Sequence, residues 1–507
     1  MQLDTTSLRE RLTAAGYTVD SVLDRIGEAG QDALGRNTTV AADVALAGAM
    51  DPLAVLVRLF LLQQAVPAGR AEAALDVEDL VVGGVLRRDG DDVVALLDLR
   101  PYDSPDDGAS GFLASDLTPG MDAATSATRS DYVLGASPAS LTLAQLVVRD
   151  EVGSALDLGT GCGVQALHLA RHCGRVVGTD LNERALECAR LTAELSGVEV
   201  DLRHGSLYEP VPGERFDLIV SNPPYVMSPP SGGDARLTYR EGTHTADGLV
   251  EAVVRGSADH LNPGGTAQFL VNWAVTADQP WQERLRGWVE GTGLDCWVIE
   301  RERLDRYSYI ELWLTDAGLA GSEEWLPAYR RWLDYFDELG IEEVGMGWIM
   351  LTAAGRAEPQ LRFESWPHAV VQPVGIAFAQ ARDAIDASLL PLDELLAAAP
   401  RLADVKQETI GEPGAADPQH IVLRQRSGLL RAIEVDTAEA AVLGALDGDL
   451  TVGQVLAAVA QVLDLDPAEL AAGVIPVIRD ALRDQLLVLG GSGEAVDEEP
   501  HVVGALN

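Results

Sequence analysis

The chain has 507 residues and a strongly acidic composition, with 79 acidic against 37 basic residues and a net charge of −42. Its apolar fraction of 47% is typical of a globular protein, and its length suits three or four domains of about 150 residues each. Such a charge argues against tight non-specific binding to a nucleic-acid backbone, which needs clustered bases, although it leaves room for a local basic groove.

The beginning of the chain suggests neither secretion nor membrane insertion. Residues 1–11 are polar and charged, which predicts no signal peptide. The most apolar early stretch, residues 52–66, is interrupted by Arg58 and is too short to span a bilayer. We therefore expect a cytoplasmic protein.

Residues 1–120 are predicted to form a separate, winged-helix-like module of helices followed by a hairpin. Ser7 is spaced to cap the first helix together with Glu10. The other predicted elements are helices at 52–64 and 76–85 and hairpin strands at 93–100 and 111–115. A DNA-reading module and a substrate-docking or dimer lobe both fit this pattern. The module has 9 basic and 20 acidic residues, so we favour the docking or dimer lobe.

A polar linker at residues 118–130 leads into the next predicted domain, residues 121–316, where apolar runs alternate with helical segments. Such alternation predicts a parallel sheet built from βαβ units. The loop at residues 131–140 precedes the first strand of this sheet. It is placed to close over a ligand, but capping of the following helix by Ser140 explains it equally well.

A glycine-rich loop follows the first buried strand, residues 155–158. Gly159, Gly161 and Gly163 allow close approach of a ligand to the backbone, and the helix that follows offers free N–H groups. Asp180 ends the next strand about 20 residues later, a spacing at which a carboxylate can accept from ribose hydroxyls. These features fit any adenosine cofactor, but Gly163 comes one residue too early for the dinucleotide pattern G-x-G-x-x-G.

A second loop, Asn222-Pro223-Pro224-Tyr225, follows another apolar strand. The two prolines stiffen the loop and remove two N–H donors, so it presents acceptors: the Asn222 side-chain oxygen and the Pro223 carbonyl. Two acceptors beside the aromatic ring of Tyr225 suit a flat substrate with an amino group. Holding both hydrogens would aim the nitrogen at an electrophilic methyl group without a strong base.

At these two loops the chain resembles class I S-adenosylmethionine (SAM) methyltransferases that alkylate planar nitrogens. The residues that carry this resemblance are Asp157-Leu158-Gly159-Thr160-Gly161-Cys162-Gly163 and Asn222-Pro223-Pro224-Tyr225. The group includes release-factor glutamine, adenine-N6 and ribosomal RNA guanine methyltransferases. The resemblance covers roughly residues 131–315. It implies a Rossmann-like α/β core with a mostly parallel seven-stranded sheet, here flanked by two helix-rich modules.

The resemblance also implies roles for individual residues. Asp157 and the loop Gly159, Thr160, Gly161 and Gly163 would hold the methionine part of SAM, and Asp180 with Leu181 would take the ribose. The tetrapeptide Asn222–Tyr225 would take the target nitrogen, and Asn222 is also a candidate cofactor-binding residue. Ser206, followed by Leu207, stands where relatives often carry an acid that meets the adenine amino group. This departure changes how the adenine would be held.

These motifs do not identify the methyl acceptor. A protein glutamine amide and a base amino group of rRNA or DNA both present a flat N–H₂ group, and a small molecule is a further alternative. Contacts to the phosphates of a duplex substrate must offset the free-energy cost of flipping out the target base. An acidic chain supplies such phosphate contacts poorly. On charge alone we favour a protein acceptor. A non-catalytic SAM-binding scaffold is the alternative of another class.

No metal site or disulfide framework is expected. Cys162, Cys173, Cys188 and Cys296 lack C-x-x-C spacing. His168 and His172 are four residues apart on the helix after the glycine loop, but Leu169 stands where H-E-x-x-H needs its glutamate. We expect these histidines to lie on a solvated helix face.

The remaining chain is predicted more coarsely. Residues 226–242, with Arg236, Tyr239 and Arg240, form either a substrate loop beside the active site or a surface excursion. Two further units are expected. The first is a helix plus β-hairpin extension at 317–400, whose strands either extend the sheet or form a small cap, and the second is a winged-helix-like module with a tail at 401–507. The elements predicted from here on are strands at 295–301, 309–314, 344–352, 360–366, 421–423, 429–435 and 486–489 and helices at 323–339, 437–446, 451–463 and 466–485.

Overall fold

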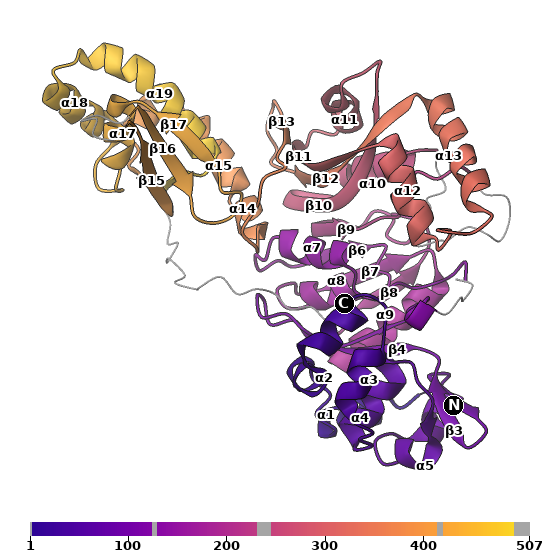
Figure 1. Cartoon of the computed structure of the whole chain (residues 1–507). Coiled ribbons are helices and arrows are strands. Elements are labelled where there is room, and N and C mark those ends of the chain that lie inside the picture. The colour runs from indigo at the N-terminus through magenta and orange to yellow at the C-terminus, as the bar shows by residue number, and fades with distance from the viewer. Residues whose placement is uncertain (1–2, 124–128, 231–244, 413–418, 491–507) are drawn as a thin grey trace. The chain divides into compact units, whose positions relative to one another are not determined.

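The computed structural model describes residues 3–123, 129–230, 245–412 and 419–490. These residues fall into two units (Figure 1). Among the described residues, the first unit comprises those up to 144 and residues 151–366, and the second comprises residues 145–150 and 367–490.

The first unit begins with a module of short helices that start at side-chain caps. Asp4, Thr18, Asp51 and Asp76 each accept a backbone N–H at the start of a helix. The predicted cap Ser7 is wrong, because Ser7 lies inside the first helix and donates its own N–H to Asp4. The elements are α1 (Thr5–Ala14), α2 (Val19–Leu34), α3 (Val40–Leu46), α4 (Pro52–Leu56), the π-helical turn η1 (Val57–Leu61), β1 (Val66–Pro67), α5 (Ala68–Ala71), α6 (Val77–Val82), β2 (Leu86–Asp89), β3 (Asp92–Ala95), β4 (Asp98–Asp103), β5 (Ser110–Ser115) and the 3₁₀ turn η2 (Met121–Ala123).

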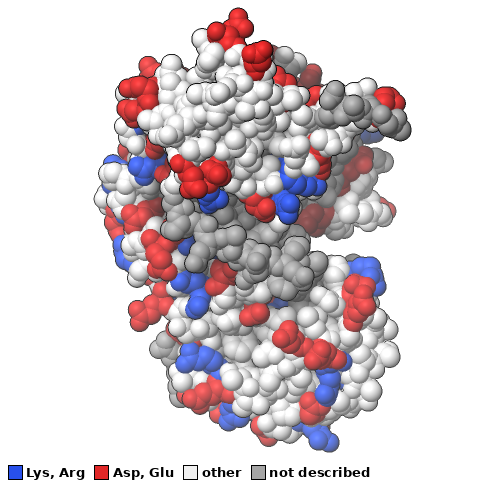
Figure 2. All heavy atoms as spheres, turned by 90° about the vertical axis from the view of Figure 1, so that its left-hand side faces the viewer, with Lys and Arg blue, Asp and Glu red and all other residues white. Residues whose placement is uncertain are grey.

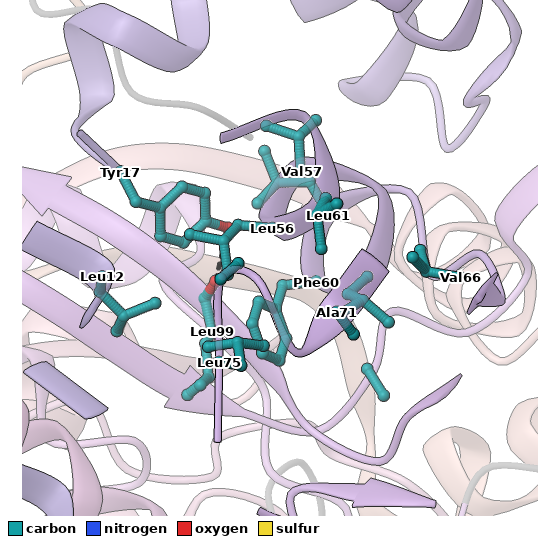
Figure 3. Close-up of a cluster of buried hydrophobic side chains, with 14 of the residues drawn as sticks. Leu12, Tyr17, Leu56, Val57, Phe60, Leu61, Val66, Ala71, Leu75 and Leu99 are labelled. Carbon is teal, nitrogen blue, oxygen red and sulfur yellow. Dashed lines mark hydrogen bonds between the residues drawn. The ribbon is translucent and has the colours of Figure 1, made fainter. Parts of the chain in front are cut away.

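The core of this module gathers around the apolar segment formed by α4 and η1 (Figure 3). Tyr17 is buried in this core and donates its hydroxyl to the Leu99 carbonyl at 2.8 Å. The predicted strand 93–100 is two strands: β3 pairs with β2, and β4 pairs with β5. The chain bends between them at Leu96 and Leu97, so each half finds a different partner. The winged-helix-like character of the module stays a prediction.

The module is joined to the following domain through contacts between β5 and helix α9 (Glu183–Ser196). The Ala114 N–H donates to Thr192 Oγ1 at 2.9 Å, and the Phe112 N–H donates to Ser196 Oγ at 3.1 Å. Two hydroxyls of α9 therefore satisfy backbone groups of β5 that would otherwise lack partners at this contact.

An eight-stranded sheet forms the centre of the first unit, with strand order β13-β11-β12-β10-β9-β6-β7-β8. The strands from β8 to β10 run parallel, β12 is antiparallel to both of its neighbours, and β13 is parallel to β11. Starting from β6, the chain adds β7 and β8 on one side of this strand and then β9 and β10 on the other side. Because connections between parallel strands are right-handed, α8 and α9 cover one face of the sheet and α10 and α11 cover the opposite face. The elements are α7 (Pro138–Leu146), β6 (Ala155–Leu158), α8 (Val164–Leu169), β7 (Val176–Asp180), α9, β8 (Asp201–His204), β9 (Phe216–Ser221), α10 (Gly248–His260), β10 (Leu261–Thr276), α11 (Trp281–Val289), β11 (Asp295–Asp305), α12 (Arg306–Asp316), α13 (Trp325–Leu339), β12 (Ile341–Thr352) and β13 (Leu361–Ser365).

The Rossmann-like α/β core is confirmed, whereas three predicted details beyond residue 300 are wrong. Residues 309–314 are not a strand but part of α12, which begins where Asp305 accepts the N–H groups of Tyr307 and Ser308. The strands β12 and β13 are not a hairpin, because β11 lies between them. Both strands extend the central sheet, which was one of the two alternatives for them, and the sheet has eight strands rather than seven. Short-range sequence patterns cannot reveal which distant strand is the partner.

The second unit has its own core and two small sheets, ordered β15-β16-β17 and β14-β18. The predicted helices and strands from residue 421 onward are present with boundaries shifted by a few residues, whereas β14, β15 and the helices before them were not predicted. Its elements are α14 (Gly375–Ala379), α15 (Ala381–Ser388), α16 (Leu392–Ala397), β14 (Pro400–Leu402), β15 (Val405–Ile410), β16 (His420–Gln425), β17 (Ala432–Val435), α17 (Thr437–Gly444), α18 (Val452–Leu463), α19 (Pro467–Arg483) and β18 (Leu487–Leu489). In the described parts of both units, no helix combines the length and apolarity needed to cross a membrane.

Candidate active site

A cavity of about 330 Å³ lies in the first unit at the carboxyl ends of β6, β7 and β9. This is where open α/β sheets bind ligands. The sequence-predicted site residues that line it are Asp157, Gly159, Thr160, Gly161, Asp180, Leu181, Ser206, Leu207, Asn222, Pro223 and Pro224. Gly163 and Tyr225 are not among its lining residues.

The glycine loop forms an open cradle at the cavity. Gly159 and Gly161 have φ angles of +77° and +55°, and a Cβ on either would meet no atom within 4 Å. Gly163 differs, because a Cβ there would approach the Ala189 Cα of α9 to 3.1 Å. The first two glycines therefore leave space for a ligand, whereas the third allows close packing of the loop against a helix.

Asp157 lies beneath this loop and is almost completely buried, with 1% of its surface exposed. Its Oδ2 accepts the Thr160 hydroxyl at 2.6 Å. Burial raises the pKa of Asp157 to about 7, although the hydrogen bond from Thr160 opposes the rise. A buried carboxyl with this pKa is poised to ionise when a cation binds beside it.

Asp180, at the end of β7, fixes the loop from the other side. One carboxylate oxygen accepts the Gly161 N–H at 3.0 Å, and the other accepts the Asn182 N–H at 2.8 Å. Burial raises its pKa, against the effect of these backbone hydrogen bonds. Leu207, across the cavity, has a φ of +48°. Such a conformation is strained for a branched side chain, and strain of this kind gathers at ligand sites.

Asn222 follows β9 and carries a buried polar atom that lacks a partner in the structure. Its Oδ1 makes no hydrogen bond with the described residues. The neighbouring Ser221 is satisfied, because its hydroxyl donates to the Leu158 carbonyl at 2.6 Å. A buried acceptor without a partner costs free energy, so a ligand with an N–H or O–H group would stabilise this site.

The ring of Tyr225 does not line the cavity, where the sequence analysis placed it beside the substrate. Its ring packs edge-to-face on Trp313 of α12, with the centroids 6.3 Å apart. Burial raises the pKa of its hydroxyl. The ring belongs to a hydrophobic cluster with α12 and α13 rather than to the wall of the cavity.

The loop at residues 131–140 forms one wall of the cavity. Asn182 Nδ2 donates to the Asp131 carbonyl at 2.9 Å, and the Val133 N–H donates to Asp116 at 2.8 Å. At its other end Ser137 and Ser140 each accept the other's backbone N–H, so Ser140 also takes part in capping α7. The loop therefore lines the cavity and caps α7, while its closure over a ligand stays a prediction.

Several lining residues were missed at the sequence level. They include Tyr132, Gln165, Thr179, Asn182, Leu249 and Val253. Asn182 directly follows the predicted ribose-binding pair and caps α9, which is a signal that sequence reasoning could have used. Leu249 and Val253 lie on α10, far along the chain, and only the crossing of this helix over the sheet brings them to the cavity.

His168 of α8 and His172, which lies in the turn after this helix, do not form the solvated helix face that the sequence suggested. His168 and His172 are only 4% and 7% exposed. His168 Nδ1 lies 2.7 Å from Asp107 Oδ2, and its Nε2 lies 2.6 Å from the Tyr102 hydroxyl. These partners come from β4 and the turn after it, which the sequence could not pair with α8. Across the described ranges, no group of three or more His, Cys, Asp or Glu side chains is arranged to hold a metal ion.

Comparison with known families assigns the domain that contains this cavity. Residues 136–288 match the family described as methyltransferase small domain. The chain contains a SAM-dependent methyltransferase domain. The open glycine cradle, the buried Asp157 and the partly buried Asp180 fit SAM, whose ammonium group and ribose hydroxyls can donate hydrogen bonds to them. Residues 14–96 match a second family, described as a domain of unknown function.

The relatives of the methyltransferase domain include ribosomal RNA small subunit methyltransferase C of Escherichia coli, 32% identical over 122 residues. This match covers 24% of the chain and 31% of the relative, so the chain matches about a third of the length of that relative. Among solved structures, the Thermus thermophilus 16S rRNA N2 G1207 methyltransferase, in complex with AdoMet and guanosine, is 21% identical, with a TM-score of 0.25. It matches 44% of this chain and 58% of its own. The YcgJ protein of Bacillus subtilis is 16% identical over 42% of this chain and 97% of its own, with a TM-score of 0.29.

Proposed function

We propose that this protein is a SAM-dependent N-methyltransferase whose acceptor is the amino group of a base in ribosomal RNA. The observation that carries the proposal is the buried, unpartnered Asn222 Oδ1 at the edge of the cavity. An acceptor atom in this position suits a substrate that donates hydrogen bonds from a planar amino group. The ribosomal RNA assignment is supported by the names of the relatives of the methyltransferase domain.

The residues of the site would act by orientation. SAM supplies the electrophilic methyl group when it is bound. Asp157 and the open loop at Gly159 and Gly161 would hold its methionine part, and Asp180 its ribose. Asn222 Oδ1 and the Pro223 carbonyl would each accept one hydrogen of the target amino group and aim the nitrogen lone pair at the methyl group. The proton is lost after the new bond makes it acidic, so no strong base is required.

The test separates cofactor binding from methyl transfer. Asn222→Ala should bind SAM with an unchanged Kd in calorimetry and should lose turnover by about 100-fold or more, as expected for removing one preorganised hydrogen-bonding group. Asn262→Ala is a matched control, because Asn262 bonds to Asp217 and does not line the cavity. Full turnover in Asn222→Ala would refute the proposed role of this side chain, and a wild-type protein with no turnover on any acceptor would leave the non-catalytic scaffold as the better description.

A protein glutamine amide remains the second candidate acceptor, and the charge of the chain favours it. Acidic side chains predominate on the face drawn in Figure 2, where the described basic residues form only small separate groups. Such a surface attracts an RNA backbone weakly. The described Arg175 and Arg203 of the methyltransferase domain are themselves paired with Asp201 and Glu214.

Methyl transfer to small ribosomal subunits and to purified release factor, measured across a salt series, distinguishes these acceptors. Transfer to RNA that falls with increasing salt, with none to protein, is the result expected here. Labelling of a lysate of the source organism with tritiated SAM provides the unbiased version. Label that survives nuclease but is lost to protease would show that the acceptor is a protein and overturn the RNA assignment.

A further inference from the structure

The connection between β11 and β12 is a pair of helices rather than a short turn. Helix α12 occupies residues 306–316, and helix α13 occupies residues 325–339. These helices contain eight of the 26 aromatic residues of the chain: Tyr307, Tyr309, Trp313, Trp325, Tyr329, Trp332, Tyr335 and Phe336. Four of them, Tyr309, Trp332, Tyr335 and Phe336, are buried in one cluster. An apolar cluster of this size makes the connection a rigid element of the first unit.

This cluster encloses the backbone that follows the Asn222–Tyr225 loop. Val226 and Met227 are 5% and 1% exposed and belong to the same cluster as α12 and α13. The Met227 N–H donates to the hydroxyl of Tyr309 at 3.1 Å. The same hydroxyl lies 3.4 Å from Asn272 Nδ2 on β10, and Tyr309 is completely buried. The position of Met227 is therefore tied to α12 and, through the same hydroxyl, to the central sheet.

A second tyrosine holds the chain where it returns to the sheet. The Ala246 N–H donates to the hydroxyl of Tyr335 on α13 at 2.9 Å. The next residue, Asp247, accepts the Ala274 N–H at 2.8 Å and is paired with Arg284. Two tyrosine hydroxyls from one helical connection thus satisfy backbone N–H groups on both sides of the segment between Met227 and Ala246.

None of these contacts belongs to the cofactor cavity. Tyr309, Trp313 and Tyr335 are absent from its lining, whereas Asn222, Pro223 and Pro224 are present. The connection reaches the loop through Tyr225, whose ring meets Trp313 edge-to-face. We therefore expect this connection to influence the position of the Asn222–Tyr225 loop and not the binding of SAM.

We propose that the α12–α13 connection positions the methyl acceptor, and that Tyr309 and Tyr335 are positioning residues that fix the backbone beyond the Asn222–Tyr225 loop. This inference rests on the proposed function, since it assigns the loop to the acceptor. Loss of either hydroxyl leaves a backbone N–H without its partner and lets the backbone shift. A displacement of about 1 Å at a reacting centre can reduce the rate by about 100-fold.

The experiment uses the full chain and the variants Tyr309→Phe and Tyr335→Phe, which keep the ring and remove only the hydroxyl. Tyr329→Phe is the matched control: Tyr329 lies on the same connection, but its hydroxyl bonds to Glu311 at 3.1 Å and not to the loop. We expect faster hydrogen exchange of the Met227 amide in Tyr309→Phe and of the Ala246 amide in Tyr335→Phe. The SAM Kd should stay within about two-fold, while kcat/KM for small ribosomal subunits should fall by about 10-fold or more. The control should match the wild type in all three measurements.

The outcomes separate this inference from the proposed function. Unchanged amide exchange in both variants overturns the inference, whether or not the protein is active. Exchange that rises while kcat, acceptor KM and SAM Kd all stay at wild-type values also overturns it, because the tyrosines would then be structural only. A loss of SAM affinity equal to the loss of turnover would assign the connection to the cofactor and refute acceptor positioning. If wild-type protein methylates release factor instead of ribosomal subunits, the RNA assignment fails, and the same variants judge the inference on that acceptor.

Discussion

The pKa of Asp157 makes SAM binding depend on pH in a defined direction. The cation expected beside this carboxyl is the ammonium group of the methionine part of SAM, which favours the ionised carboxylate. The pKa of the buried carboxyl in the SAM-free protein is raised to about 7. Binding below that pH must therefore release a proton, so the affinity should fall as the pH is lowered. The effect of this carboxyl on the free energy of unfolding has the opposite dependence on pH. The native state keeps the proton to a higher pH than the unfolded chain does, so the contribution of this group to stability is lost as the pH rises through about 7.

The size of the effect follows from the ionised fraction. A carboxyl with a pKa of about 7 is about one-tenth ionised at pH 6 and about three-quarters ionised at pH 7.5. If only the carboxylate form binds, the Kd for SAM should be about eight-fold weaker at pH 6 than at pH 7.5. In the wild type, the Thr160 hydroxyl lies 2.6 Å from Asp157 Oδ2, and its hydrogen bond lowers the pKa of Asp157. Thr160→Val removes this hydroxyl, so the pKa of Asp157 should rise. This variant should shift the midpoint of the pH dependence upward.

Isothermal titration calorimetry between pH 6 and 7.5, in buffers of different ionisation enthalpy, measures both the Kd and the protons released. Asp157→Asn cannot ionise, so it should bind SAM weakly and lose the pH dependence over this range. A wild-type Kd that stays flat from pH 6 to 7.5 would refute the reasoning. The same slope in Asp157→Asn as in the wild type would assign the titration to another group.

Two further predictions concern the cradle and the contact between the modules. Gly161→Ala should weaken SAM binding by at least about 10-fold, because its Cβ would enter open space at the cavity and its φ of +55° disfavours a side chain. Gly213→Ala, at a comparable φ of +74° but away from the cavity, should leave SAM calorimetry unchanged, and equal effects of both variants would mean that strain alone is responsible. Thr192→Val removes the acceptor of the buried Ala114 N–H and should lower the free energy of unfolding by about 1–3 kcal/mol in urea denaturation. The exposed control Thr315→Val should change it by less than about 0.5 kcal/mol, and an equally small effect of Thr192→Val would show that this hydrogen bond does not stabilise the contact.

The sequence by itself determined the central part of the methyltransferase domain. The runs 155–158, 176–180 and 216–221 are short, apolar and bounded by polar or glycine residues, so their strand character and the loops at their carboxyl ends follow from local chemistry. Parallel strands bring those ends to the same edge of the sheet, which is why Asp157, Asp180 and Asn222 were expected together and line one cavity.

Only the tertiary structure decided the features that depend on distant partners. Residues 309–314 have an apolar pattern that suits a strand, but packing against α13 and β12 makes them a helix. The burial of His168 requires Asp107 from the turn after β4, and the position of Tyr225 requires Trp313 from α12. A local pattern shows how apolar a segment is. Which distant segment it packs against depends on packing across the whole unit, and this packing determines where these side chains lie.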